Sequence, residues 1–184
     1  MNRFSFEETS IKDLYVVRRN AIGDSRGFFS RFFCAEEFSK VGWDKAVRQI
    51  NQTLTSQCRS IRGMHYQKPP YAETKIVSVL RGEVWDVVID IRRDSDTFLQ
   101  WHAERLSAEN RTSLYIPEGF AHGFQTLSND CELIYLHSSD YRPGAEAGIN
   151  PFDHAVNIDW PYDVSEISDR DKAHALLTDR FEGI

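Results

Sequence analysis

The sequence has 184 residues, of which 41% are hydrophobic and 27% are charged, a composition that excludes an intrinsically disordered chain. Its 22 Lys and Arg residues and 28 Asp and Glu residues give a formal net charge of -6, which argues against nucleic-acid and anionic-membrane partners. A small anionic ligand stays compatible with this charge, because a ligand responds to the local field. No apolar run reaches the roughly 18–20 residues of a membrane span, and residues 1–12 lack the apolar stretch of a secretion signal. We therefore expect a single cytoplasmic domain over residues 1–184.

Cysteine usage supports the same compartment. Cys34, Cys58 and Cys131 are odd in number and do not have the spacing of a metal site. They predict reduced thiols in the core, not a disulfide framework.

The first predicted element is a short helix over residues 35–41, which Gly42 would end as a glycine stop. From about residue 60 to residue 140, short apolar segments alternate with turn residues, a pattern typical of an antiparallel sandwich or small barrel. Residues 75–80 and 83–91 flank Arg81-Gly82 and are both rich in β-branched side chains. We expect these two segments to form a hairpin.

Further strands are predicted at residues 113–116, 123–127 and 132–137, with a turn at residues 128–130 between the last two. Near the end of the chain, Ser168 is followed by Asp171 in the spacing of a capping box, which predicts a last helix around residues 172–177. The predicted fold class is therefore mostly β, with short helices outside the sheets.

Two histidines lie beside glycines at expected strand ends. His65 lies in residues 61–67 (IRGMHYQ), and His122 lies in residues 117–124 (PEGFAHGF), which has the P-x-G-x-x-H form of a cupin barrel. Metal cupins offer H-x-H in the first segment, whereas Gln67 stands here in place of the second histidine. Three interpretations stay open: a metal site of His65, Glu73 and His122, a free imidazole acting as a base near neutral pH, or ordinary structural histidines.

Several other side chains indicate a function only if they belong to one common site. Arginines near predicted turns offer planar forks of donors that fit phosphate oxygens, although each alone is best explained as a solvated side chain. The arginines in question are Arg26, Arg48, Arg59, Arg62 and Arg81. Lys75 would place a fixed positive charge near His65 if it points inward, whereas Tyr135 in an apolar strand is more often a core residue.

The motifs together are similar to those of the dTDP-4-dehydrorhamnose 3,5-epimerase family, over about residues 5–177. They are residues 24–29 (DSRGFF), 61–67 (IRGMHYQ), 75–92 (KIVSVLRGEVWDVVIDIR), 106–110 (LSAEN), 116–124 (IPEGFAHGF) and 159–161 (DWP). The resemblance implies a cupin-like antiparallel jelly-roll barrel without metal or cofactor. It also implies a homodimer that acts as an isomerase on a nucleotide-diphosphate-linked 4-keto-6-deoxyhexose.

The resemblance also assigns roles to individual residues. His65 resembles the base that removes a proton beside the ketone, and Asp171 resembles the acid that orients it. Lys75 is expected to stabilise the enolate oxygen, and Tyr135 to deliver a proton to the opposite face. These roles fit the reaction, because inversion beside a carbonyl needs a base, an acid and a held oxyanion. The expected substrate contacts are Arg26 and Arg62 at the diphosphate, with Gln49, Asn51, His122 and Glu146 elsewhere in the pocket.

The chain departs from the family pattern at three places. Asp140-Tyr141 stands where two adjacent aromatic residues are common, so a stacking surface is lost and a carboxylate is added. Residues 150–153 (NPFD) replace a stretch that contains Trp, and Leu136-His137 replaces a more polar Lys-Cys type of pair. These departures leave the nucleotide base and the sugar open.

Several alternative functions follow from the same residues. The protein could invert C3 and C5, only one of them, or act as a 3,4-ketoisomerase on another nucleotide sugar. A metal-dependent cupin enzyme and a non-catalytic sugar-nucleotide-binding cupin are the alternatives from other classes.

Overall fold

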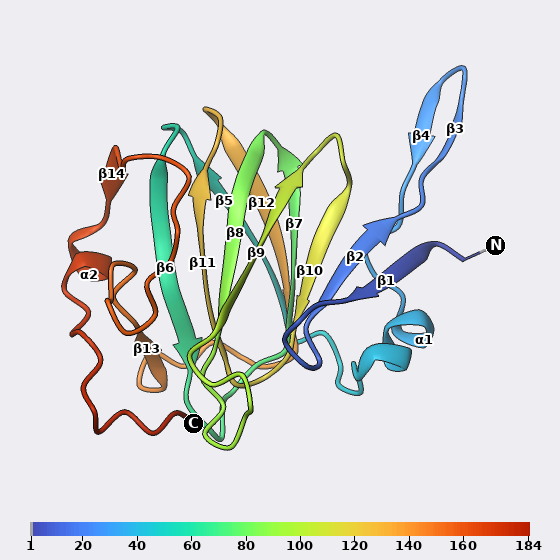
Figure 1. Cartoon of the computed structure of the whole chain (residues 1–184). Coiled ribbons are helices and arrows are strands. Elements are labelled where there is room, and N and C mark those ends of the chain that lie inside the picture. The colour runs from blue at the N-terminus through green and yellow to red at the C-terminus, as the bar shows by residue number, and fades with distance from the viewer. Residues whose placement is uncertain (1) are drawn as a thin grey trace.

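The computed structural model describes residues 2–184 and contains two antiparallel sheets that face one another (Figure 1). The first sheet has the strand order β1-β2-β10-β7-β12-β5. In that order the strands are Phe4–Glu8, Tyr15–Arg19, Thr112–Ile116, Lys75–Arg81, Cys131–His137 and Gln49–Thr55.

The second sheet has the strand order β13-β6-β11-β8-β9, and β14 adds to β6 in parallel. In that order, with β14 last, the strands are Glu146–Gly148, Ser60–Gln67, Phe120–Thr126, Glu83–Asp90, Trp101–Ser107 and Glu166–Ile167. A separate hairpin of β3 (Ile22–Asp24) and β4 (Gly27–Phe29) projects away from both sheets (Figure 1).

The main core lies between the two sheets, because buried side chains of both contribute to one apolar cluster. Val77 and Leu114 enter it from the first sheet, and Val88 and Phe124 enter it from the second. These residues are at most 2% exposed, and removal of such apolar surface from water is the main force that holds the sheets together. The arrangement is a cupin-like jelly roll with short peripheral helices, so the predicted fold class is confirmed.

The predicted hairpin of residues 75–80 and 83–91 is wrong, although both segments are strands. β7 pairs with β10 and β12, whereas β8 pairs with β9 and β11 in the other sheet. Arg81-Gly82 is therefore a corner between sheets, at which Gly82 adopts a φ of 75°. Alternating β-branched residues predict that a segment is a strand, but they do not select its partner.

The first predicted helix is confirmed as α1 (Ala35–Phe38) followed by a 3-10 turn (Ser39–Val41), and Gly42 ends it with a φ of 97°. The last helix is displaced from its predicted place at residues 172–177. It is α2 (Asp169–Lys172), and the Ser168 hydroxyl accepts a hydrogen bond from the Asp171 backbone N–H at 3.1 Å.

The chain just after the helix is held by a side chain from another segment. Nδ2 of Asn150 donates to the carbonyl oxygens of Lys172 and His174, at 3.3 and 3.0 Å. The segment that contains α2 and β14 runs alongside β6 (Figure 1). It therefore brings the last part of the chain against a strand that carries His65.

Two smaller expectations concern membranes and thiols. In residues 2–184, no helix is long and apolar enough to cross a membrane. Cys34, Cys58 and Cys131 are all free, but only Cys131 is fully buried.

Candidate active site

A cavity of about 670 Å³ opens between the two sheets. Strands β6 and β11 form one wall, β5, β7 and β12 form the other, and residues of β13, β14 and α2 close one side. Every predicted site residue except Arg26 lines it, namely His65, Tyr135, Asp171, Lys75, Arg62, Gln49, Asn51, His122 and Glu146. The fold thus brings together side chains from six strands and a helix.

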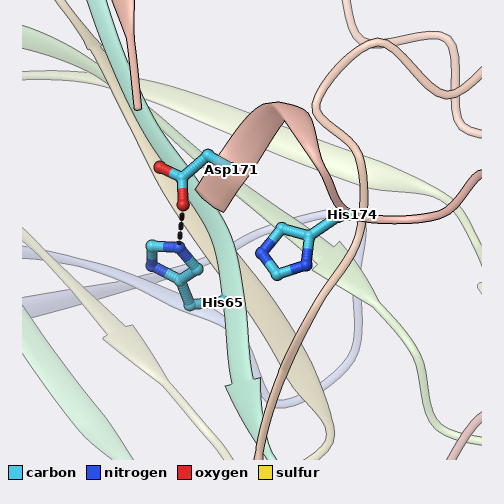
Figure 2. Close-up of side chains that lie close together, drawn as sticks. All are labelled: His65, Asp171 and His174. Carbon is cyan, nitrogen blue, oxygen red and sulfur yellow. Dashed lines mark hydrogen bonds and ion pairs between the residues drawn. The ribbon is translucent and has the colours of Figure 1, made fainter. Parts of the chain in front are cut away.

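His65 and Asp171 form a hydrogen-bonded pair at the wall of this cavity. Nε2 of His65 lies 2.8 Å from Oδ1 of Asp171 (Figure 2). Oδ2 of Asp171 accepts from the backbone N–H of Gly63 at 3.2 Å. Burial alone would raise the pKa of Asp171, but these two hydrogen bonds lower it below its usual value. An ionised carboxylate therefore holds the imidazole by Nε2, which leaves Nδ1 as the nitrogen able to take a proton.

The backbone conformation at position 63 and the close approach of the neighbouring strand both require a glycine there. Gly63 has a φ of 134°, and a Cβ there would lie 2.5 Å from Cα of Gly123 on the neighbouring strand. A larger residue would push β6 and β11 apart beside His65. The glycine in the motif IRGMHYQ thus allows the close strand approach that presents its N–H to Asp171.

Lys75 lies at the start of β7 within a buried group of charges. Its Nζ is 3.0 Å from Oε1 of Glu73, and Oε2 of Glu73 is 3.0 Å from Nδ1 of His137. Burial alone would raise the pKa of Glu73, but the charges and hydrogen bonds of Lys75 and His137 lower it to about 2. Lys75 itself is 5% exposed, so its ammonium group is fixed at the cavity wall.

Tyr135 faces the cavity from β12, on the sheet opposite to that of His65. Its ring stacks on His137 at a centroid distance of 6.0 Å and meets His122 edge-on at 6.2 Å. Burial raises the pKa of Tyr135, because a phenolate there would lose its hydration. The phenol is therefore held in its protonated form.

His122 lines the cavity, but one of its two ring nitrogens is already engaged. Nε2 of His122 lies 2.9 Å from Oδ1 of Asp86, and the Asp86 side chain is completely buried. Among the described residues, His65, Glu73 and His122 do not come close enough together to form the metal site considered from the sequence. Within residues 2–184, the one His, Cys and carboxylate group close enough to hold an ion is His65, Asp171 and His174.

The two arginines predicted to bind a diphosphate lie in different places. Arg62 lines the cavity and forms no ion pair with any described residue; its Nε donates to the Thr55 hydroxyl at 2.8 Å. Arg26 lies on the projecting β3–β4 hairpin, 2.6 Å from Asp24, with 88% of its side chain exposed. It does not line the cavity of its own chain.

The departures from the family pattern also have defined positions. Asp140 binds Arg48, with Oδ2 and NH2 3.0 Å apart, so its charge is neutralised at the surface. Tyr141 lines the cavity, and its hydroxyl donates to Glu146 at 2.8 Å. Arg170 also binds Glu146, with NH2 of Arg170 3.0 Å from Oε1 of Glu146.

Sequence reasoning missed four side chains of the site, which are Glu73 as a partner of Lys75, His137, Arg170 and His174. One of the four had a local signal, because residues two apart in a strand share a face and His137 therefore follows from Tyr135 in β12. Glu73 lies just before β7, which begins at Lys75, so this alternation does not extend to it. Arg170 lies in the four-residue helix α2, and His174 lies in irregular structure just after it, so strand alternation applies to neither.

The sequence is similar to known proteins over most of its length. The sequence profile of a family described as dTDP-4-dehydrorhamnose 3,5-epimerase matches residues 8–179. The dTDP-4-dehydrorhamnose 3,5-epimerase of Salmonella typhimurium is 39% identical over 171 residues, which are 92% of this chain and 93% of that protein.

Two solved structures extend the comparison to the fold. The crystal structure of dTDP-6-deoxy-D-glucose-3,5-epimerase from Legionella pneumophila in complex with dTDP-4-keto-L-rhamnose has a TM-score of 0.89 and 38% identity, covering 94% of this chain and 92% of that one. The crystal structure of a 3'-monoepimerase from Streptomyces bikiniensis in complex with dTDP-quinovose has a TM-score of 0.85 and 34% identity. The match covers 91% of this chain and 85% of that one.

All of these relatives are epimerases, and the protein is accordingly an enzyme of the isomerase class built on a cupin-like jelly roll. The match to the family extends over most of the chain, residues 8–179. The chain belongs to the dTDP-4-dehydrorhamnose 3,5-epimerase family.

Proposed function

We propose that this enzyme inverts C3 and C5 of a dTDP-linked 4-keto-6-deoxyhexose in deoxysugar biosynthesis, using His65 as the base and Tyr135 as the acid. One observation carries the proposal. His65 and Tyr135 line the same cavity from opposite sheets, so a sugar ring between them would present opposite faces to the two side chains. A base and an acid on opposite faces are what inversion beside a ketone requires.

In the proposed reaction, His65 removes the proton from the carbon beside the ketone, and the electron pair moves into the carbonyl group to form an enolate. The ammonium group of Lys75 stabilises the oxyanion. Tyr135 then donates its proton to the other face of the carbon, while the imidazolium of His65 is stabilised by Asp171. Solvent returns a proton to Tyr135 and takes one from His65, so the enzyme is regenerated without a redox change.

The diphosphate would bind at Arg62, whose guanidinium group has no ionic partner in the described chain. Gln49, Asn51, Glu146 and His122 would surround the sugar or the nucleotide. Arg26 can take part only if it reaches the cavity of another chain, since it projects from its own chain on the β3–β4 hairpin (Figure 1).

We therefore include a homodimer in the proposal. The projecting hairpin exposes Phe28 at 61% and Phe29 at 57%, and the edge strand β5 exposes Ile50 at 61%. Apolar side chains of this size at a protruding hairpin and a sheet edge are typical of an interface. The expected partner is a second copy, in which the hairpin would supply Arg26. A cytoplasmic location, which three free thiols support, is also part of the proposal.

Mass measurement by light scattering during size-exclusion chromatography tests the dimer. Phe28→Asp should reduce the mass from two chains to one. Leu176→Asp, at a side chain 54% exposed near the other end of the chain, is the matched control and should leave two chains. A wild-type protein with the mass of one chain, or a Phe28→Asp variant with the mass of two, would contradict this interface.

Hydrogen exchange with solvent tests the reaction. In deuterium oxide, the enzyme should introduce deuterium at C3 and C5 of the dTDP-4-keto-6-deoxy sugar, and both signals should be lost in His65→Asn. Absence of exchange with thymidine-linked and cytidine-linked sugars alike would refute the proposed activity.

A second candidate is inversion of C3 alone. It is favoured by the similarity to the Streptomyces bikiniensis 3'-monoepimerase, at 34% identity over 91% of this chain. The same experiment separates the two candidates, because a monoepimerase would release product inverted at C3 and not at C5.

A further inference from the structure

His174 lies beside the His65–Asp171 pair without taking part in the proposed epimerisation. The centroids of the two imidazole rings are 6.0 Å apart, and their planes are inclined by 71°. Nε2 of His174 is buried and has no hydrogen-bond partner among the described residues. Figure 2 shows a ring nitrogen of His174 turned toward the pair. A buried imidazole nitrogen without a partner is costly unless something else binds it.

The local backbone makes room for this ring. Gly148 lies opposite His65 in the β13–β6 ladder, and a Cβ at Gly148 would lie only 2.2 Å from Nε2 of His174. The half-buried His174 thus occupies the space that a side chain at position 148 would fill. The glycine allows a second imidazole to pack directly behind the first.

We propose that His65, Asp171 and His174 form a binding site for one Zn²⁺ ion. One ligand atom from each residue can be chosen so that all three lie within 4.8 Å of one another. Two imidazole nitrogens and a carboxylate oxygen are typical zinc ligands, and water from the open cavity would fill the fourth position. The softness of the two nitrogens favours Zn²⁺ or Co²⁺ over Mg²⁺, which prefers oxygen ligands.

Zinc binding requires only a small rearrangement. With metal–ligand distances of about 2.0–2.1 Å, tetrahedral ligands lie roughly 3.3 Å apart. Nε2 of His65 and Oδ1 of Asp171 would therefore separate slightly from their 2.8 Å hydrogen bond, and the His174 ring would move closer. The metal would take the place of the proton that His65 and Asp171 now share.

Arg170 opposes the ion in two ways. Its NH2 lies 3.1 Å from Nε2 of His65, and its Nε lies 3.7 Å from Oδ1 of Asp171. Its guanidinium group thus competes for the zinc ligands and repels a cation. Glu146 holds Arg170 from the other side at 3.0 Å, so the arginine can turn outward while keeping an ionic partner.

The consequence for catalysis rests on the proposed function. An ion bound to His65 and Asp171 would prevent the imidazole from acting as a base, so Zn²⁺ would inhibit epimerisation reversibly. Chelation by EDTA would restore the activity. The rate of epimerisation would then depend on the concentration of free zinc. Without zinc, the reaction would be unchanged.

The test is a direct titration of the full chain, treated with EDTA and dialysed, using Co²⁺ as a spectroscopic probe and Zn²⁺ as its competitor. We expect one Co²⁺ per chain with visible ligand-field bands of a four-coordinate site and without the charge-transfer band of a thiolate ligand. Replacement of His174 by Gln removes a direct ligand and should weaken binding by at least about 100-fold, the upper end of the loss caused by changing an outer-shell partner. His154→Gln, which changes an exposed histidine, is the matched control and should bind as the wild type does.

The outcomes separate this site from adventitious binding and from the epimerase activity itself. Arg170→Gln should bind more tightly than the wild type, a change that misfolding would not produce. Equal affinity in His174→Gln and His154→Gln, or a thiolate band, would overturn the site. If the metal affinities change in these variants as predicted but the protein shows no hydrogen exchange with the sugar, the zinc site is upheld and the proposed function is refuted.

Discussion

Nε2 of His65 lies 2.8 Å from Oδ1 of Asp171, although 106 positions of sequence separate the two residues. The contact forms because β14 adds to β6 and places α2 against the strand that carries His65. In the proposed mechanism, this carboxylate fixes the orientation and the protonated nitrogen of the imidazole.

Asp171→Asn tests that role. The amide presents a donor as well as an acceptor, so it would no longer stabilise the imidazolium that forms during proton removal. We expect kcat to fall by roughly 10²–10⁴-fold. Steady-state kinetics should be compared with Asp169→Asn, the matched control on the same helix, whose side chain is fully exposed. Similar rates in the two variants would contradict the role of Asp171.

Tyr135→Phe separates proton removal from proton delivery. The buried phenol is held protonated, and its replacement by Phe keeps the ring packing against His122 and His137 while removing the proton. Inversion should fall by roughly 10²-fold or more, whereas His65 should still exchange the substrate proton with solvent. Nuclear magnetic resonance in deuterium oxide measures both processes in one sample. Loss of both in equal proportion would show that Tyr135 does not act as the separate acid.

Much of the fold follows from local sequence, but its connections do not. β7, β8 and β10–β12 are evident from short β-branched segments between turn residues, and the glycine stop after residues 35–41 is correctly predicted. The assignment of β7 and β8 to different sheets depends on which strands bury the most surface together. A corner at Arg81-Gly82 and a hairpin turn have similar sequences, so local pattern cannot separate them.

The residues of the candidate site are also predictable only in part from local sequence. His65 and His122 are evident because each lies in a glycine-containing motif. Asp171 has a sufficient local explanation as a helix-capping residue, and only the tertiary structure directs its carboxylate to Gly63 and His65. Arg26 carries a local motif, but the motif does not predict that Arg26 lies on a projecting hairpin, outside the cavity of its own chain.

The acid stability of the protein should depend on Glu73. The pKa of this carboxyl group is lowered from 4.5 to about 2 in the folded chain, because Lys75 and His137 outweigh the effect of burial. Between pH 4.5 and about 2 the unfolded chain binds more protons at this position, so stability falls as the pH falls. The contribution is complete above pH 4.5 and amounts to about 3 kcal/mol.

Urea unfolding between pH 2 and pH 6 measures this contribution. The difference in free energy of unfolding between the wild type and Glu73→Gln should shrink steadily as the pH falls through the window. Glu109→Gln, at an exposed carboxylate, is the matched control. A constant difference across the window would mean that Glu73 does not form the proposed charge group with Lys75 and His137.

His122 is predicted to be a structural partner as much as a substrate contact. Asp86 is completely buried, and Nε2 of His122 lies 2.9 Å from its carboxylate. In His122→Ala the carboxylate would remain buried without its partner, so the free energy of unfolding should fall by about 3–5 kcal/mol. Adding Asp86→Asn should recover part of this loss, because it removes the unpaired charge. Unchanged stability in His122→Ala together with a higher KM would instead mark His122 as a substrate contact alone.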